Sequence, residues 1–355
     1  MTARADIAVV GSGAAGIAAA VCAARLGCRT VLFDQRGSGG GTGGFSGLTT
    51  LCGLYDDQGR YINEGFPREF AQSIAEREPV KMGKVWVLEY RPERFRETAE
   101  TLFDQTEGLE TRWNTRLADV VVEAGRIVSL NGVRVGAVID CSGTAEVARA
   151  VGAECLETDE KTQADAVLFP LSPVTCDLGT PAAVARVLLP LVRAGLPPLG
   201  FHTSLEPETV TVKFTGRPEQ VPEVIEFLKK NVAGFERCTT PLAEFTPARR
   251  MGRMVVGSYV LTGADVLAAR KFPDAVARCA WPIEQWSADG AVRFRYLPAG
   301  GHYDIPARVL RAARMENLYM AGKTISAEPD AIASARVMGC CLATGEAAAT
   351  LAAKL

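Results

Sequence analysis

The stretch that decides the fold is D-I-A-V-V-G-S-G-A-A-G-I-A-A-A, residues 6–20. Residues 6–10 have the composition of a short buried strand, and an Ala-rich helix is expected over 14–27. Residues 29–34, R-T-V-L-F-D, predict a second buried strand. Because both strands are apolar throughout, this strand–helix–strand unit is typical of a parallel sheet covered on both faces.

The glycines between the first strand and the helix have separate physical roles. Gly11 makes the tight turn, Gly13 lets the backbone approach a pyrophosphate, and Gly16 allows close packing of helix on strand. The helix start, with Ala14 and Ala15, presents free N–H groups and a partial positive charge to phosphates. The pattern therefore predicts a dinucleotide site, and a glycine-rich turn without a ligand is the alternative.

An acid at the end of the second strand completes the pattern. Asp34, followed by Gln35, can accept hydrogen bonds from ribose hydroxyls, and a carboxylate there disfavours a 2′-phosphate. FAD and NAD share this pattern. Three features favour FAD: the glycine-rich loop 37–53, the strand that ends in D-C-S-G (140–143), and a strand–loop–helix return from residue 321. An NAD-dependent dehydrogenase stays open as an alternative.

Composition narrows the classes of function that the chain could have. The chain has 355 residues, is 48% hydrophobic, and has a net charge of −2, so nothing indicates nucleic-acid binding. Ten scattered cysteines without a CxxC pair, and only two histidines, argue against a metal site. We expect a cytoplasmic protein, because the thiols suggest a reducing compartment and no secretion signal is visible. The apolar stretch 332–355 is interrupted by Arg336 and Glu346, so it predicts a packed helix and no membrane span.

Other segments extend the α/β pattern beyond the first unit. Helices are expected over 92–105 and 221–231. Strands are expected over 117–123, 126–130, 135–141, 165–171, 209–214 and 317–322. From about residue 156 the pattern changes, so we predict a discontinuous FAD-binding domain, 1–155 with 301–355, and an inserted substrate or cap domain, 156–300.

Four stretches carry a family resemblance: V-I-D-C-S-G-T-A-E-V-A-R-A-V-G-A (138–153), residues 220–236, residues 257–283, and residues 316–339. They resemble FAD-dependent oxidoreductases of the glutathione-reductase type and, more distantly, fumarate-reductase-like flavoproteins. The resemblance implies a Rossmann-type, glutathione-reductase-like FAD-binding domain with an inserted α+β cap. It also implies that the last helix directs its dipole at the flavin through Ile332, Ala333 and Ser334. The remaining cofactor contacts that it implies are Gly11, Gly13, Gly16, Asp34, Gly41, Thr42, Gly43, Leu117, Ser142, Gly143, Gly322 and Lys323.

Four residues are candidates for catalysis. Arg250 and Arg253 could orient a carboxylate or an oxyanion, or they could form an ordinary ion pair. His302 could be a general base, or an ordinary loop histidine. Glu328 stands where the family often has Thr-His and could titrate beside the flavin.

The expected activity is hydride transfer between a small organic substrate and the flavin. Only one dinucleotide pattern is visible, so the electrons would leave to oxygen, a quinone, a diffusible carrier or a protein acceptor. An alternative is a flavin-bearing subunit or maturation factor that acts on a partner protein.

Overall fold

A computed structural model describes residues 4–156, 163–178, 180–196, 199–242, 244–287 and 292–355. Its central feature is a seven-stranded sheet with the order β6-β2-β1-β9-β8-β7, in which β19 also pairs with β9. Five of the strands are parallel, and β8 and β7 continue the sheet in antiparallel fashion. The bounds are β1 (Arg4–Val10), β2 (Thr30–Phe33), β6 (Leu109–Arg112), β7 (Val120–Glu123), β8 (Arg126–Leu130), β9 (Val133–Asp140) and β19 (Leu318–Met320).

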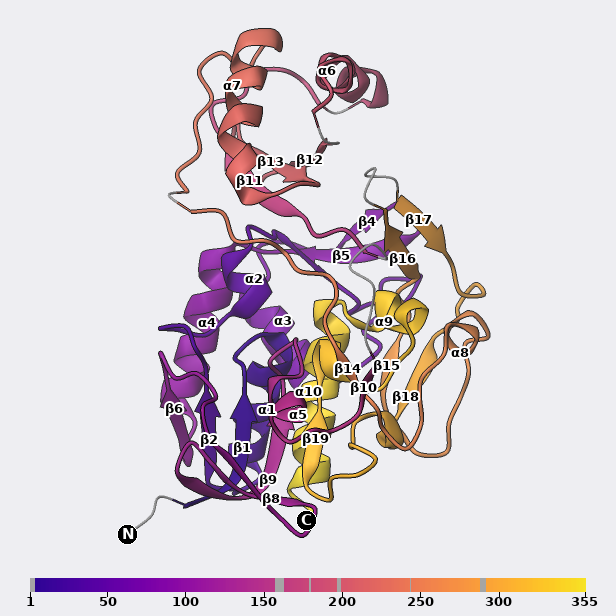
Figure 1. Cartoon of the computed structure of the whole chain (residues 1–355). Coiled ribbons are helices and arrows are strands. Elements are labelled where there is room, and N and C mark those ends of the chain that lie inside the picture. Colours follow the sequence, from indigo (N-terminus) through magenta and orange to yellow (C-terminus); the bar gives the residue numbers. More distant parts are fainter. Residues whose placement is uncertain (1–3, 157–162, 179, 197–198, 243, 288–291) are drawn as a thin grey trace.

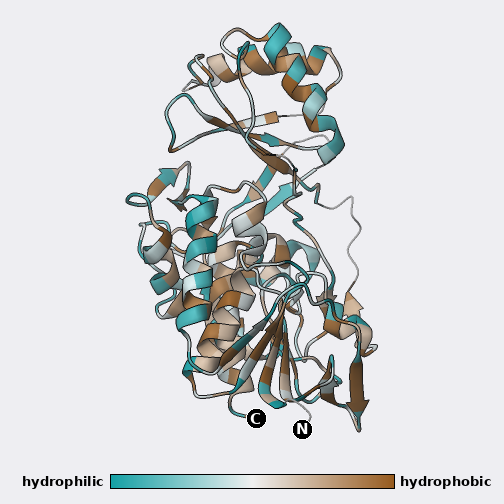
Figure 2. Cartoon of the chain, turned by 90° about the vertical axis from the view of Figure 1, so that its left-hand side faces the viewer, coloured by the Kyte–Doolittle hydropathy of each residue, from teal (hydrophilic) through white to brown (hydrophobic). Residues whose placement is uncertain are grey.

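Both faces of the central sheet are buried, which explains the uninterrupted apolar run in β1. Ile7 and Val9 belong to one hydrophobic cluster, and Ala8 and Val10 to another on the opposite face. Figure 2 shows these strands as mostly hydrophobic. The helices around the sheet are α1 (Ala14–Arg25), α2 (Gly41–Phe45), α3 (Phe66–Ile74), α4 (Pro92–Gln105), α5 (Glu146–Ala150) and α10 (Met338–Ala352).

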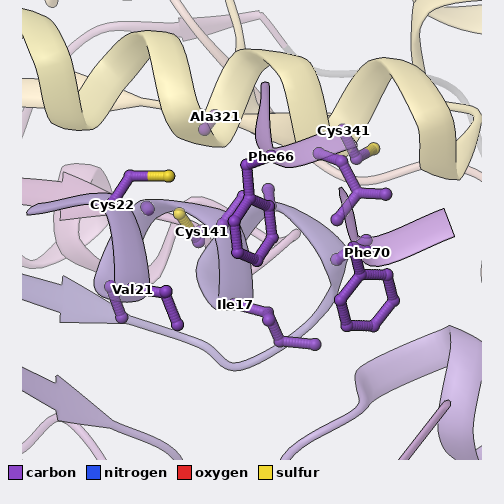
Figure 3. Close-up of a cluster of buried hydrophobic side chains, with 14 of the residues drawn as sticks. Ile17, Val21, Cys22, Phe66, Phe70, Cys141, Ala321 and Cys341 are labelled. Carbon is purple, nitrogen blue, oxygen red and sulfur yellow. The ribbon is translucent and has the colours of Figure 1, made fainter. Parts of the chain in front are cut away.

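The two ends of the chain meet where α10 packs against α1 (Figures 1 and 3). A Cβ atom added to Gly345 would lie 2.2 Å from the carbonyl oxygen of Ala15, so the two helices are closer than any side chain at that position would permit. Ile17 of α1 and Phe66 of α3 belong to the same hydrophobic cluster as buried residues of these two helices (Figure 3). The C-terminal segment therefore completes the domain that the first thirty residues begin.

A second lobe has its own hydrophobic core (Figure 1). An antiparallel sheet in the order β11-β13-β12 carries two helices, and its buried residues include Val212 and Phe214. The bounds are β11 (Val167–Leu171), α6 (Pro181–Arg193), β12 (Leu199–Thr203), β13 (Val210–Phe214) and α7 (Val221–Asn231). We call this lobe the cap.

The rest of the predicted insertion packs elsewhere. Residues from 254 to 306 share a hydrophobic cluster with one side of α10 and with α9 (Pro329–Ala335). The other elements here are β10 (Cys155–Leu156), β14 (Met254–Val255), α8 (Gly263–Leu267), β15 (Ala275–Cys279), β16 (Ile283–Trp286), β17 (Val292–Arg295) and β18 (Tyr303–Pro306). Residues 157–162, at the predicted boundary, lie outside the described part. The division into two domains stays a proposal, and the core of the cap runs from β11 through α7 to Cys238.

Two expectations need correction. The single final helix is two helices, because Val337 is extended (φ −66°, ψ 148°) and separates α9 from α10. The glycine-rich loop is also partly regular: it contains α2 and β3 (Thr50–Cys52), which pairs with β5 (Val85–Glu89) beside β4 (Val80–Met82). By contrast, helices 92–105 and 221–231 are confirmed at both ends. No helix within the described ranges is both long and apolar enough to cross a lipid bilayer.

Candidate functional site

A cavity of about 860 Å³ lies at the carboxyl ends of β1, β2 and β9 and extends beneath the cap. Ligands of open α/β sheets bind at this edge of the parallel strands. Most of the predicted cofactor residues line the cavity: Gly11, Gly13, Ala14, Ala15, Asp34, Gln35, Gly41, Thr42, Gly43, Leu117, Ser142, Gly143, Gly322 and Lys323. Residues far apart in the sequence are therefore brought to one surface, although their contacts with FAD stay predictions.

The glycines of the first turn differ in what surrounds them. A Cβ atom added to Gly16 would lie 1.7 Å from the carbonyl oxygen of Gly11, so this glycine is required by packing and does not line the cavity. A Cβ added to Gly13 would meet no atom within 4 Å, because it would project into open space. Gly13 is also the N-cap of α1, where free N–H groups favour an anion.

Two aspartates hold the backbone around the cavity. The Asp34 carboxylate accepts hydrogen bonds from the backbone N–H and the hydroxyl of Ser12, at 2.7 and 2.6 Å. Asp140 is fully buried, and it accepts hydrogen bonds from Ser142 and from the backbone N–H groups at the start of α5. Burial raises the pKa of Asp140. The D-C-S-G sequence is thus a structural anchor that fixes the loop on which Ser142 faces the cavity.

The helix start that faces the cavity is that of α10. Val337 and Met338 line the cavity, whereas Ile332, Ala333 and Ser334 lie in α9, buried and outside the lining. The predicted position of these three residues at the start of the last helix is corrected, because the break at Val337 makes α10 the last helix. The Ser334 hydroxyl instead bonds to the Trp281 carbonyl and the Tyr303 hydroxyl.

Three of the four catalytic candidates do not line the cavity. Arg253 is outside the lining. The His302 ring lies 3.9 Å from Asp304, and burial and Lys271 lower its pKa. Glu328 is exposed and accepts a hydrogen bond from the first N–H group of α8. The structure therefore gives His302 and Glu328 structural surroundings away from the cavity, and only Arg250 stays a candidate.

Sequence reasoning missed a polar chamber at the cap end of the cavity. Its lining includes Lys213 of β13, Arg250, Glu284 and Trp286 of β16, and Trp281. The Trp286 ring has the Lys213 ammonium 3.2 Å from its centroid and the Arg250 guanidinium carbon at 4.4 Å. The Glu284 carboxylate accepts hydrogen bonds from the indole N–H groups of Trp281 and Trp286, at 2.9 and 2.6 Å.

Burial and the neighbouring charges together determine the protonation of this chamber. Burial, together with Arg250, lowers the pKa of Lys213 to about 7. Burial and Arg336 lower the pKa of Arg250 to about 10. Burial opposes ionisation of Glu284, but Arg336 and the indole N–H groups outweigh it and lower the pKa of this carboxyl. At neutral pH the chamber holds an ionised acid beside a lysine that can take up or release a proton.

The residues of the cavity fit FAD. The open space at Gly13 can admit a pyrophosphate beside the α1 N-terminus. At the other end, the buried Nε atom of Arg336 has no hydrogen-bond partner among the described residues, and this side chain lines the cavity just before α10. A buried guanidinium N–H without a partner is costly unless a ligand supplies an acceptor. Within the described chain, no group of three or more His, Cys, Asp or Glu is arranged to hold a metal.

Comparisons with known proteins agree with this geometry. A family model for FAD dependent oxidoreductases matches residues 6–189 and 200–354. No curated protein matches the sequence. The geranylgeranyl bacteriochlorophyll reductase-like protein of Thermoplasma acidophilum is 15% identical with a TM-score of 0.53, over 99% of this chain and 77% of that one.

Two further solved structures are similar. Aquifex aeolicus GidA is 13% identical with a TM-score of 0.53, over 99% of this chain and 63% of that one. BexE is 13% identical with a TM-score of 0.51, over 97% of this chain and 60% of that one. This chain thus spans less than two thirds of either protein, and likeness at such identities shows the fold alone. The family match over nearly the whole chain carries the assignment: the protein belongs to the FAD-dependent oxidoreductases, enzymes that use FAD as their cofactor.

Proposed function

We propose that the protein transfers a hydride between a small organic substrate and FAD, in the chamber beneath the cap. The observation that carries the proposal is the continuity of one cavity, from Gly13 at the phosphate turn to Lys213, Arg250 and Glu284 under the cap sheet. The flavin supplies the hydride chemistry when bound, and the protein supplies position, proton handling and charge control.

The first part of the cavity would hold the ADP half of FAD. The N-terminus of α1 faces the pyrophosphate there, and Asp34 is the acceptor for ribose hydroxyls. At the other end, the first turn of α10 and the Arg336 Nε–H group supply positive potential. Positive potential at that point stabilises negative charge on a reduced ring.

The chamber residues would bind the substrate and control its proton. Trp281, Trp286 and Leu168 provide apolar surface that limits water. The Lys213 Nζ atom can hold or release a proton near neutral pH, because its pKa is lowered to about 7. Glu284 stays ionised and is fixed by two indole N–H groups, so it serves as a fixed charge.

Electrons would leave to an external acceptor, because the sequence has one phosphate-turn pattern of this kind. Oxygen, a quinone, a diffusible carrier or a protein can each fill that role. A flavin-bearing subunit of a larger enzyme would use the same cavity, and turnover that depends on a copurifying protein would identify it.

The visible spectrum of the purified protein, followed by anaerobic bleaching, tests the proposal. The panel contains organic acids, alcohols and amines, and each oxidised counterpart is tested against the reduced protein. We expect a flavin spectrum and bleaching by at least one class. A protein that binds FAD but exchanges electrons with no member in either direction would contradict the hydride-transfer proposal.

A further inference from the structure

The chamber beneath the cap carries more positive charge than its own acids neutralise. Its described cations are Lys213, Arg250 and Arg336, and the acids that act on them are Glu284 and Asp165. Among the residues that the structure describes, no carboxylate forms an ion pair with any of the three cations. A buried cation without a paired carboxylate is unfavourable unless a ligand supplies the charge.

The two acids are already engaged by other donors. Both Glu284 carboxylate oxygens accept indole N–H groups, and one Asp165 oxygen accepts the backbone N–H of Arg250 at 2.9 Å. The Arg250 side chain donates to the carbonyl of Ala164, and its guanidinium lies against Trp286. Lys213 lies against the same ring, so one indole positions both cations before any ligand arrives.

The cavity continues from these cations into an apolar mouth. Met82, Val292, Phe294 and Tyr296 line it, and the last two rings stack with their centroids 5.9 Å apart. Phe294 and Tyr296 are 42% and 41% exposed, unusually so for large aromatic side chains. A ligand that fits both the cations of the chamber and the aromatic rings of the mouth needs an anionic head and an apolar, planar body.

We propose that the substrate is an organic acid whose carboxylate is bound by Lys213 and Arg250 and whose apolar body extends toward Phe294 and Tyr296. This inference rests on the proposed function and assigns its substrate class. Lys213 and Arg250 lie on one ring with Glu284 as the acid beside them, so the chamber suits an anionic group. A guanidinium and an ammonium are also the donors that carboxylates use in proteins. Arg36, Arg249 and Lys323 are further cations of the cavity lining. Lys323 lies beside Gly143, on the side assigned to ADP, and donates to the carbonyl of Arg249.

The proposal predicts a pH dependence of binding. The titratable or charged groups that act on Lys213 are Arg250, Glu284, Cys52 and Arg336, and His202 of β12 also lies within its influence. Burial lowers the pKa of His202 to about 4, so this ring is neutral when Lys213 titrates. Lys213 loses its charge as the pH rises through about 7, so affinity for a carboxylate falls above that pH.

Difference spectroscopy of the FAD-bound protein tests this, with benzoate as the anionic probe and benzamide as its neutral counterpart. At pH 6 we expect benzoate to bind at least about tenfold more tightly than benzamide, and the ratio to shrink at pH 8.5. K213M should weaken benzoate binding by roughly tenfold to a hundredfold and remove the pH dependence. The matched variant K213R should keep the affinity at both pH values, because an arginine stays charged.

Equal affinities for the two probes, no binding of either, or an unchanged benzoate affinity in K213M would overturn the substrate class. The retained flavin spectrum of each variant shows that the fold is intact. The proposed function fails differently: benzoate would bind as described, but no organic compound would exchange electrons with the flavin.

Discussion

Substitution of Gly13 by alanine separates the binding of FAD from the folding of the chain. Gly13 has φ −71° and ψ −175°, a conformation that alanine adopts without strain, and its added Cβ would meet no atom within 4 Å. Replacement of a glycine by alanine restricts the unfolded chain and thereby stabilises the folded protein by about 0.4–1 kcal/mol. Alanine is a poorer N-cap than glycine, by a similar amount. The two effects oppose each other, so we expect the FAD-free protein to unfold within about 1 kcal/mol of the wild type.

The same methyl group has a large effect on the cofactor. It would occupy the space into which the pyrophosphate must come, beside the N-terminus of α1. Forcing an extra carbon into a close-packed contact costs about 1–3 kcal/mol. That cost corresponds to a loss of FAD affinity of roughly fivefold to a hundredfold. Gly13→Val should lose more, since its two further methyl groups extend into the same space.

The assay is a titration of FAD-free protein with FAD, followed by fluorescence quenching and by the unfolding temperature. Gly37→Ala is the matched control: it lies in the nearby glycine-rich stretch, outside the cavity lining, with its nearest contact at 3.5 Å. It should bind FAD as the wild type does. Gly16→Ala should instead prevent folding, because its Cβ would lie 1.7 Å from a carbonyl oxygen. Wild-type FAD affinity in Gly13→Ala would refute the placement of the pyrophosphate.

Three further predictions test the described packing and charges. Asn317→Ala should destabilise the protein by roughly 2–3 kcal/mol in urea unfolding, because it removes two buried hydrogen bonds to Ile127 and a partly buried one to Gly136. A loss below about 0.5 kcal/mol would contradict this bonding. His302→Ala should leave the rate of flavin reduction by substrate within about twofold, and a drop of about a hundredfold would restore this histidine as a general base. Folding lowers the pKa of Lys213 to about 7. Above that pH the unfolded chain keeps the lysine proton that the folded protein has lost. The free energy of unfolding of the FAD-free protein should therefore rise from pH 7 to 9. In Lys213→Met, thermal unfolding at the two pH values should lack that part of the increase.

Local sequence was sufficient for the elements on which we propose that the ADP half binds. Helix 92–105 begins at a proline, and the turn at Gly11 lies between a buried strand and a helix, so propensity and tertiary structure agree there. The break between α9 and α10 was not visible. Neither a proline nor a glycine occupies the position of the break, Val337. Its extended conformation accompanies a close approach in which Gly339 comes against the backbone of Gly53 and Leu54. That contact joins residues almost three hundred positions apart.

Lys213 was missed for a related reason. The alternation in V-T-V-K-F (210–214) correctly predicts a strand, with Val212 and Phe214 on the core face. A lysine on the other face of a three-stranded sheet ordinarily indicates solvent. Only the position of the cap over the cavity turns that face inward, and neither periodicity nor composition reports how two lobes are placed.

The conflict between local pattern and final burial at Lys213 is itself informative about function. Burial of a lysine in a stable core is opposed by desolvation, and an apolar residue at this point would remove that penalty. The chain instead places Lys213 against Trp286, with Arg250 on the same ring and no ion-paired carboxylate among the described residues. Such departures from an otherwise consistent sequence concentrate where a site binds something that the chain does not contain. If an anionic substrate compensates the charge, its binding should raise the pKa of Lys213 and take up protons from solution near pH 7 to 8. Proton uptake measured on adding benzoate, and absent in Lys213→Arg, would connect the buried charge to substrate binding, whereas binding without uptake would leave Lys213 outside the site.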